Sequence, residues 1–474
     1  MTLTPPAARR RVRARVQGTV QGVGFRPHAF RLAGEEGLGG WVRNDAHGVE
    51  LEVEGPPEAV ERFLVRLEGE APPLARLERV QREERPARGD ADFAILASEA
   101  GPPDAQVSPD TATCEACLAE LRDPADRRHR YPFVNCTDCG PRFTIVLGVP
   151  YDRPRTTMAG FAMCPACQAE YDDPRDRRFH AQPNACPACG PRAWLATRGG
   201  DPVAGDGDGD PVGAAARALR EGAIVAVKGL GGFHLACRAA DEAAVARLRG
   251  RKHREDKPFA LLAASVGDAR ALVALDAAAA RALTSPARPI VLAPRRPGAA
   301  VAGQVAPRSA DLGVMLPYTP LHHLLAGDVG EPIVLTSGNI SDEPIAFEDA
   351  DALARLSAIA DLFLLHDRPI GVRADDSVMR AARHPIVLRR SRGLVPEALA
   401  LPVPAPRPLL ACGAELKSAF CLAREGRGWV SHHIGDLTNH ETLRSFAAGV
   451  EHFGALFAVA PEAVAHDLHP DYLS

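Results

Sequence analysis

No run of apolar residues in this sequence is long enough to cross a bilayer, and its first residues do not pair a positively charged stretch with an apolar one as a secretory signal does. Aromatic residues make up only 5% of the chain, and its 56 basic and 60 acidic residues leave a net charge of −4. Nucleic-acid-binding proteins carry a strong positive field, which this balance does not supply. We therefore expect a cytoplasmic protein with no membrane and no nucleic-acid partner. A length of 474 residues predicts roughly three or four domains, since ~100–200 residues per domain is typical.

Eight of the 11 cysteines form two blocks with the same C-x2-C-x18-C-x2-C spacing. The second block begins 50 positions after the first, and 15 of the 29 residues from Cys114 to Arg142 recur at that offset. The chain therefore contains an internal duplication. The two sets are Cys114, Cys117, Cys136 and Cys139, and Cys164, Cys167, Cys186 and Cys189.

Four thiolates surround a zinc ion as a tetrahedron, and each C-x-x-C turn supplies two of them, so two turns complete a closed site. A disulfide framework is the alternative, but it requires an oxidising compartment and is typical of short secreted chains. We predict two structural Zn²⁺ sites. The four turns can be paired in three ways, and we favour sequential pairing because each repeat holds one full set. Cys237, Cys412 and Cys421 remain, and we expect them to be small buried hydrophobic residues.

Three segments rich in Pro, Gly and Asp mark domain boundaries: Ser98–Asp110, Gly199–Pro211 and Leu401–Pro408. They divide the chain into four parts and predict a multidomain protein that combines α+β and α/β units. The parts are residues 10–97, 108–198, 211–400 and 407–474.

The first part reads as a ferredoxin-like α/β sandwich with the order βαββαβ. Val12, Ala14 and Val16 alternate as in a strand, and residues 25–36 follow with a helical pattern. The other expected elements are strands at residues 40–45, 49–54, 76–80 and 93–96, and a helix containing Val60, Phe63, Leu64 and Leu67.

Glycines punctuate the loop Gly18–Arg26 between the first strand and helix, so its backbone amides can turn toward one point and cradle an anion. With Gly40–Asn44, this stretch resembles the acylphosphatase signature. The resemblance implies that Arg26 holds the phosphate and Asn44 orients the attacking water. A tight turn with a solvated arginine and a hairpin-capping asparagine is the alternative. The acylphosphatase resemblance also implies a phosphate-binding loop, which consists of Val20, Gln21, Gly22, Val23, Gly24 and Phe25.

Together, an acylphosphatase-like domain and a duplicated zinc module resemble the HypF carbamoyltransferases, maturation proteins of nickel-iron hydrogenases. The stretches at residues 150–154, Thr156–Met158 and Arg177–Pro183 look like the zinc region of that family. The match extends from near residue 10 to the end of the sequence.

Residues 211–400 alternate strand and helix patterns, such as the apolar run Ile224–Val227 and the helical periodicity of residues 239–248. They predict an α/β domain with a mixed sheet. A cationic segment, Arg251–Pro258, follows, and such a run is ordinarily a solvated face.

This segment resembles the K-x-R element of the YrdC family, whose nucleotide cleft also uses an S-x-N element. The resemblance implies an ATP and carbamate site, with Mg²⁺ accompanying the triphosphate. This part has no Walker A motif and no G-x-G-x-x-G fingerprint, so nucleotide binding is implied by the resemblance alone. The implied residues are Lys252, Arg254, Lys257, Ser337 and Asn339, with Ser377, Arg390 and Arg392 as further candidates.

The last part, Arg407–Ser474, begins like the Kae-type domain of HypF proteins, a member of the actin-like ATPase fold. Its 68 residues are too few to bury the core of that fold, so we predict a partial domain whose strand edges either dock on the preceding domain or fray. The pairs His432 with His433 and His466 with His469 are expected to be ordinary polar residues and not metal ligands.

The resemblance implies a relay. Carbamoyl phosphate is hydrolysed at Arg26 and Asn44, ATP converts the carbamate to carbamoyl adenylate, and the carbamoyl group passes to the C-terminal cysteine of HypE, on the route to the cyanide ligands of the hydrogenase. We expect this chain to perform the first two steps and not the third. Two alternatives are a threonylcarbamoyl-adenylate synthase, whose family lacks the first two domains, and a non-enzymatic zinc-ribbon scaffold.

Overall fold

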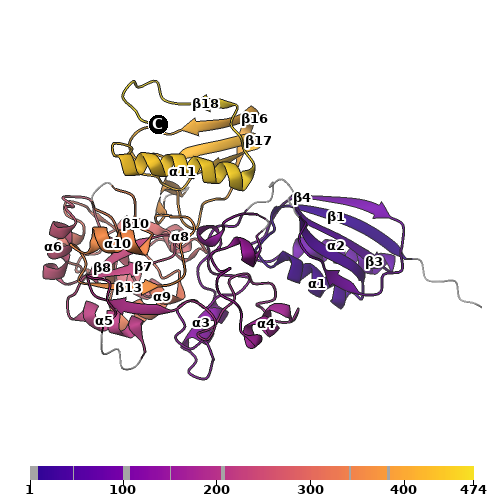
Figure 1. The fold of residues 1–474 in the computed structure, drawn as a ribbon, viewed down its shortest axis with the longest axis horizontal. Coiled ribbons are helices and arrows are strands. Elements are labelled where there is room, and N and C mark those ends of the chain that lie inside the picture. The colour runs from indigo at the N-terminus through magenta and orange to yellow at the C-terminus, as the bar shows by residue number, and fades with distance from the viewer. Residues whose placement is uncertain are drawn as a thin grey trace, which may run out of the picture.

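The computed structural model describes residues 9–45, 47–99, 107–149, 151–203, 209–340, 343–381 and 385–474. In Figure 1 the two units that contain α3 and α4 lie between a small α/β domain and a large one, and a C-terminal unit lies above the large domain. None of the helices within these ranges is both long and apolar enough to cross a membrane. Residues 100–106 and 204–208, the centres of two predicted boundaries, lie outside the described residues.

The small domain has the expected ferredoxin-like order, with a fifth strand added beside β2 in the sheet β4-β1-β3-β2-β5. Alternate residues of β1, including Val12, Ala14 and Val16, are buried in its core with Phe63 and Leu67 of the second helix. The elements are β1 (Arg10–Thr19), α1 (Phe25–Glu35), β2 (Gly39–Asp45), β3 (Gly48–Gly55), α2 (Pro57–Gly69), β4 (Arg76–Arg85) and β5 (Phe93–Ile95).

The two cysteine repeats have the same local structure. In each, a short helix starts directly after the first cysteine, α3 (Glu115–Arg122) after Cys114 and α4 (Pro165–Asp172) after Cys164. The four sulfurs of each repeat lie within 4.8 Å of one another, so sequential pairing is confirmed. Two 3-10 turns, η1 (Phe143–Ile145) and η2 (Arg153–Arg155), connect the repeats.

The repeats contact each other reciprocally. Arg127 and Arg128 of the first repeat pair with Glu170 of the second, and their equivalents Arg177 and Arg178 pair with Glu120 of the first. These arginines also donate to a cysteine of the opposite repeat: Arg127 and Arg128 to the Cys167 Sγ at 3.4 and 3.6 Å, and Arg177 to the Cys117 Sγ at 3.1 Å. Arginine side chains of each repeat therefore donate hydrogen bonds to the cysteine set of the other repeat.

The large domain is built on a ten-stranded mixed sheet, with the order β15-β14-β10-β11-β9-β12-β8-β7-β13-β6. Its strands are β6 (Ala193–Ala196), β7 (Val225–Lys228), β8 (Phe233–Arg238), β9 (Ala260–Leu262), β10 (Ile290–Pro294), β11 (Asp311–Met315), β12 (Ile333–Ser337), β13 (Leu362–His366), β14 (Val378–Arg380) and β15 (Ile386–Arg389). The helical elements are α5 (Pro211–Arg220), α6 (Glu242–Arg251), α7 (Val266–Leu272), α8 (Ala277–Thr284), η3 (Gly303–Val305), α9 (Pro320–Val329) and α10 (Asp349–Leu356).

The edge strand β6 comes from the end of the second cysteine repeat, where it pairs antiparallel with β13. The sequence analysis assigned these residues to the zinc module, because the repeat runs to within a few residues of them. The pairing ties the cysteine repeats to the large sheet.

The C-terminal unit is a three-stranded sheet, β17-β16-β18, covered by one long helix (Figure 1). Its core includes Phe420 and Phe453 and continues onto Phe143 and Tyr151 of the linker between the repeats. Of the two expected outcomes, docking is therefore the one observed. The elements are β16 (Leu399–Cys412), β17 (Phe420–Val430), α11 (His440–Phe457) and β18 (Ala463–Ala465).

The proline-rich segment Leu401–Pro408 belongs to strand β16 and is not the linker that the sequence analysis expected. Its pairing with β17 is interrupted, with register shifts between Ala400 and Ala405 and between Ala405 and Leu409. Proline has no amide hydrogen, so it interrupts the ladder without preventing an extended backbone.

Candidate active sites

The loop before α1 has the backbone that an anion cradle requires. Gly22 and Gly24 adopt left-handed conformations, with φ of 70° and 77°, which glycine reaches without the strain of a Cβ. No described residue accepts a hydrogen bond from the amides of Gly22, Val23, Gly24 or Phe25. These donors lie at the start of a helix, where an anion is favoured.

Arg26 lies in the first turn of α1, and its side chain is only 8% exposed. Its guanidinium contacts Asp152 at 3.6 Å and the Ser98 hydroxyl at 3.4 Å. Burial lowers the pKa of Arg26, and the nearby Asp152 only partly offsets this. A buried arginine with so few partners is poised to bind an anion.

Asn44 lies on β2 with its side chain buried, and neither its amide oxygen nor its amide nitrogen has a hydrogen-bond partner among the described residues. Gln21 ties the loop to this strand, because its Nε2 donates to the carbonyls of Asp45 and Gly48 at 2.7 and 2.9 Å. The loop and Asn44 thus belong to one rigid unit.

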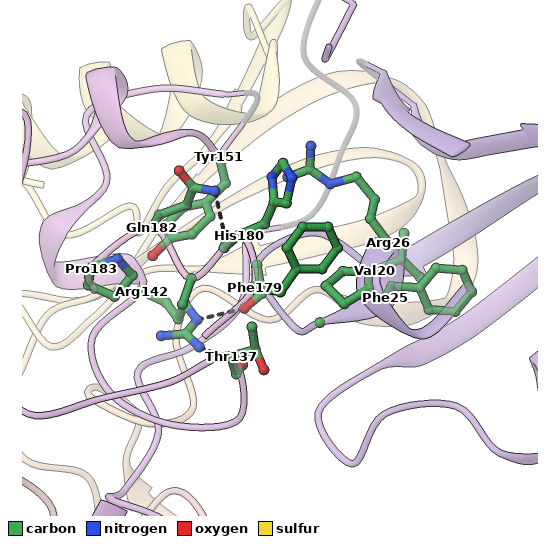
Figure 2. A pocket seen from close by; sticks show the side chains of 14 residues that line it. Val20, Phe25, Arg26, Thr137, Arg142, Tyr151, Phe179, His180, Gln182 and Pro183 are labelled. Carbon is green, nitrogen blue, oxygen red and sulfur yellow. Dashed lines mark hydrogen bonds between the residues drawn. The ribbon is translucent and has the colours of Figure 1, made fainter. Parts of the chain in front are cut away.

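The wall opposite the loop comes from the cysteine repeats (Figure 2). Arg142 donates from Nε to the Gly22 carbonyl at 2.7 Å, and the ring of Tyr151 lies so close to Gly22 that a Cβ there would stand 2.9 Å from it. The hollow is small, about 20 Å³. From the first domain it is lined by Val20, Gly22, Gly24, Phe25, Arg26 and Pro27, and from the repeats and the linker between them by Thr137, Arg142, Tyr151 and Phe179 to Pro183.

Of the residues expected here, Gln21, Val23 and Asn44 do not line the hollow, whereas Val20, Gly22, Gly24, Phe25 and Arg26 do. Sequence reasoning missed the whole opposite wall. The motif Arg177–Pro183 was recognised as a family feature, but nothing in it indicated that it faces Arg26.

The second site is a cavity of about 420 Å³ in the large domain. It brings together the two elements expected from distant parts of the sequence: Lys252 Nζ donates to the Ser337 carbonyl at 2.8 Å and to the Asn339 carbonyl and side-chain oxygen, each at 2.5 Å. Ser337 is the last residue of β12. The predicted residues that line the cavity are Lys252, Arg254, Lys257, Ser337 and Asn339.

His234 and Asp376 also line this cavity, and the sequence analysis did not name them. The His234 Nε2 lies 3.1 Å from Asp376, whose other oxygen accepts from Arg392 at 2.8 Å. Burial alone would raise the pKa of Asp376, but Arg392 and His234 outweigh it and hold the pKa well below its usual range. Arg392 also lies 3.3 Å from the ring centre of Tyr318.

Ser377, Arg390 and Arg392 do not line the cavity, although their neighbours Asp376 and Arg389 do. Ser377 donates to the Arg392 carbonyl, and Arg390 donates to the carbonyls of Leu394 and Glu397. Their assignment to a nucleotide stays a prediction.

The C-terminal unit supplies part of the wall, at Lys417, His433 and Asp436. Burial lowers the pKa of His433 to about 4. The sequences around these residues were identified only as features of the Kae-type domain, so their position at this cavity was not predicted. His466 and His469 are exposed, and within the described part of the chain they belong to no metal-binding cluster.

The two cysteine sets fit zinc. A Zn–S bond of about 2.3 Å places tetrahedral sulfurs about 3.8 Å apart. Three sulfur pairs in each set lie 3.5 to 3.8 Å apart, and all four sulfurs of a set lie within 4.8 Å of one another. Four thiolates close the coordination sphere, so such a metal supports structure and leaves no position for substrate.

Four family models match the chain. They are Acylphosphatase at residues 12–95, HypF finger at 113–146 and 163–196, Telomere recombination (Sua5, YciO and YrdC) at 217–391, and HypF Kae1-like domain at 404–474. Carbamoyltransferase HypF2 of Cupriavidus necator is 49% identical over 98% of this chain and 60% of its own length. The chain belongs to the HypF carbamoyltransferase family. It spans about 60% of the length of this HypF relative.

A crystal structure of full-length HypF in a phosphate- and nucleotide-bound form matches with a TM-score of 0.94 and 42% identity, over 98% of this chain and 61% of that one. The family resemblance and the fold class are thereby confirmed. An acylphosphatase of Salinibacter ruber is 49% identical over 72 residues, which are 15% of this HypF chain and 75% of that protein.

Proposed function

We propose that this HypF chain hydrolyses carbamoyl phosphate in the hollow at Arg26 and uses ATP, with Mg²⁺, to activate the resulting carbamate in the cavity at Lys252. The observation that carries the proposal is the pair of sites: a small hollow with unpaired amides and a buried arginine, and a far larger cavity lined by cations. The first suits a small phosphorylated anion and the second a nucleotide.

In the first step, the loop amides and Arg26 bind the phosphoryl oxygens, and Asn44 orients a water molecule. The water oxygen bonds to phosphorus, the P–O bond to the carbamoyl group breaks, and carbamate and phosphate result. Donors that are already oriented stabilise the charge that develops on the phosphoryl oxygens.

In the second step, a carbamate oxygen attacks the α-phosphorus of ATP, and pyrophosphate leaves. Lys252, Arg254 and Lys257 would neutralise the charge of the phosphates, while Ser337 and Asn339 fix the position of Lys252. The phosphate- and nucleotide-bound form of the related HypF supports two such sites in one molecule.

A third hollow, about as small as the first, supports the proposal that carbamate, which is short-lived in water, is transferred inside the protein. Its lining includes Pro141, whose carbonyl accepts from the Tyr151 hydroxyl of the first site at 3.4 Å, and Tyr318, which stacks under Arg392 beside the second site. Carbamate would pass between these residues.

We further propose that the eight cysteines hold two zinc ions, which requires a reducing compartment such as the cytoplasm. Transfer of the carbamoyl group to the C-terminal cysteine of a HypE-type partner, toward the cyanide ligands of [NiFe] hydrogenase, is proposed for HypF proteins at their full length.

An assay of phosphate and pyrophosphate release tests the proposal. Carbamoyl phosphate alone should yield phosphate, and with ATP it should also yield pyrophosphate. An Arg26→Ala variant should lose both products. Pyrophosphate release that depends on threonine and bicarbonate would favour the synthase alternative, and full function in Arg26→Ala would favour a scaffold.

A further inference from the structure

The motif Arg177–Pro183 shares only its two arginines with its equivalent in the first repeat, and one of the positions that differ is His180, which stands where the first repeat has Arg130. Arg130 and His180 are 50 residues apart, and both have a left-handed backbone, with φ of 55° and 56°. Arg130 reaches the large domain, where it pairs with Asp328 and Asp210, each at 2.6 Å. The duplication thus provides two equivalent turns, and the second carries a histidine toward the acylphosphatase-like domain.

His180 is fixed beside Arg26 (Figure 2). Its amide donates to the Tyr171 carbonyl at 3.1 Å, and its own carbonyl accepts from Gln182 Nε2 at 2.8 Å. Its ring lies against Phe179 and Tyr171, with centroids 4.5 and 5.0 Å away. Within the described residues, no hydrogen bond is formed by either ring nitrogen of His180. The imidazole of His180 is therefore fixed by its neighbours and faces the hollow, and its ring nitrogens can bond to a substrate.

The chemistry at the hollow is divided between its two walls. The loop amides and Arg26 form a wall of donors, which suits phosphoryl oxygens. The wall from the repeats carries His180, and burial, followed by the charge of Arg26, lowers the pKa of its imidazole to about 4. A neutral imidazole has one acceptor nitrogen and one donor nitrogen, whereas the protonated form would repel Arg26.

We propose that His180 determines acyl specificity, by accepting a hydrogen bond from the amino group of a carbamoyl substrate bound with its phosphoryl end on the loop. An acetyl group has a methyl in place of that amino group and cannot donate. A site that hydrogen-bonds a polar group of its substrate rejects analogues that lack this group, because the polar group of the protein is then left without a partner. This inference rests on the proposed hydrolysis of carbamoyl phosphate. The match to the Salinibacter acylphosphatase covers only the first domain, so it does not include this wall.

The test compares kcat/KM for carbamoyl phosphate and acetyl phosphate in the zinc-loaded full chain. Wild type should prefer carbamoyl phosphate. In His180→Ala, the value for carbamoyl phosphate should fall by about tenfold, the worth of one neutral hydrogen bond, while the value for acetyl phosphate changes little. His180→Asn should restore part of the preference, because asparagine tolerates a left-handed backbone and can accept a hydrogen bond. Arg175→Ala, at a side chain that is 91% exposed, is the matched control.

An equal loss for both substrates would overturn the inference, since it would show that His180 only supports the wall. An unchanged preference in His180→Ala would overturn it as well. Failure of the proposed function looks different: wild type would then hydrolyse neither acyl phosphate.

Discussion

At the scale of single residues, the surroundings of Arg26 exclude the solvated arginine that a simple tight turn would carry. The side chain is 8% exposed, and Asp152 is its one carboxylate partner within the described structure. Asp152 lies in the linker between the cysteine repeats, so a carboxylate from outside the first domain lies beside Arg26. A carboxylate near the guanidinium competes with any anion that enters the hollow.

We predict that Asp152→Asn tightens the binding of inorganic phosphate by about threefold, the size expected for a partly exposed ion pair. The amide keeps the shape of the side chain but removes its charge. Product inhibition by phosphate during acyl phosphate hydrolysis measures the change. Asp173→Asn, in the second repeat and with a side chain that is 39% exposed, serves as the control. Weaker phosphate binding in Asp152→Asn would mean that the carboxylate is needed to orient Arg26.

Lys252 is the residue on which the second site depends, because its 1% exposed side chain joins α6 to the end of β12. We expect Lys252→Ala to lower pyrophosphate release by on the order of 100-fold, as for loss of an oriented charge-stabilising group. Phosphate release from carbamoyl phosphate should be unchanged, because the first site does not use it. Glu255→Ala, at an exposed neighbour, is the control. Equal loss of both products would indicate that the two sites are not separate.

At the scale of elements, the duplication makes each cysteine set depend on the opposite repeat. The Arg127 side chain is 35% exposed, so its removal leaves the protein core intact. It donates to Cys167, while its equivalent Arg177 donates to Cys117. Partners of this kind fix the orientation of a metal ligand and offset thiolate charge.

We therefore predict crossed effects on zinc. Arg127→Ala should weaken zinc retention by the second set and Arg177→Ala by the first, by about tenfold or more. Alkylation of cysteines during chelator titration, with the modified peptides identified by mass spectrometry, tells the two sets apart. Arg175→Ala should behave as wild type. Loss of zinc from the mutated repeat itself would contradict the crossed arrangement.

The elements differ in how far their sequences determine them. The spacing of the cysteines predicted both four-cysteine sets, and alternation predicted strands such as β1, because these patterns are local. Strand β16 was missed, since its prolines are typical of a linker and only pairing with β17 makes them part of a sheet. The pairing of strand β6 with β13 was not predicted, because the four residues of β6 carry no sign of that partner.

At the scale of the whole molecule, sites were predictable where one module forms them and were missed where modules meet. The glycine loop and the Lys252 and Ser337 elements carry family signatures within one domain. His180 and Asp152 face Arg26, and Lys417 lines the cavity at Lys252, only because separate units dock on one another. Contacts between residues more than 100 positions apart leave no periodic or spacing signal in a single sequence.

Histidines are buried both inside the first domain and where units dock on one another, and this predicts how the molecule responds to acid. Burial lowers the pKa of His28 and of His180 to about 4, and that of His432 to about 3. An unfolded chain has histidines with a pKa near ~6.5. At pH values between the native and unfolded pKa, the unfolded state therefore binds more protons than the native state. The contribution of these histidines to the free energy of unfolding is fully present above the unfolded pKa and is lost as the pH falls toward the native pKa.

We expect the melting temperature to fall steadily between pH ~6.5 and pH ~4, in buffer with excess zinc to keep the cysteine sets occupied. His28→Gln should flatten this dependence, because it removes one buried group that resists protonation and lies in the first domain, away from the cysteine repeats. His469→Gln, at an exposed position in the last unit, should leave the slope as in wild type. If His28→Gln and wild type show the same slope, protonation of His28 does not contribute. The acid response must then come from histidines buried where units meet, of which His180 is the next to substitute.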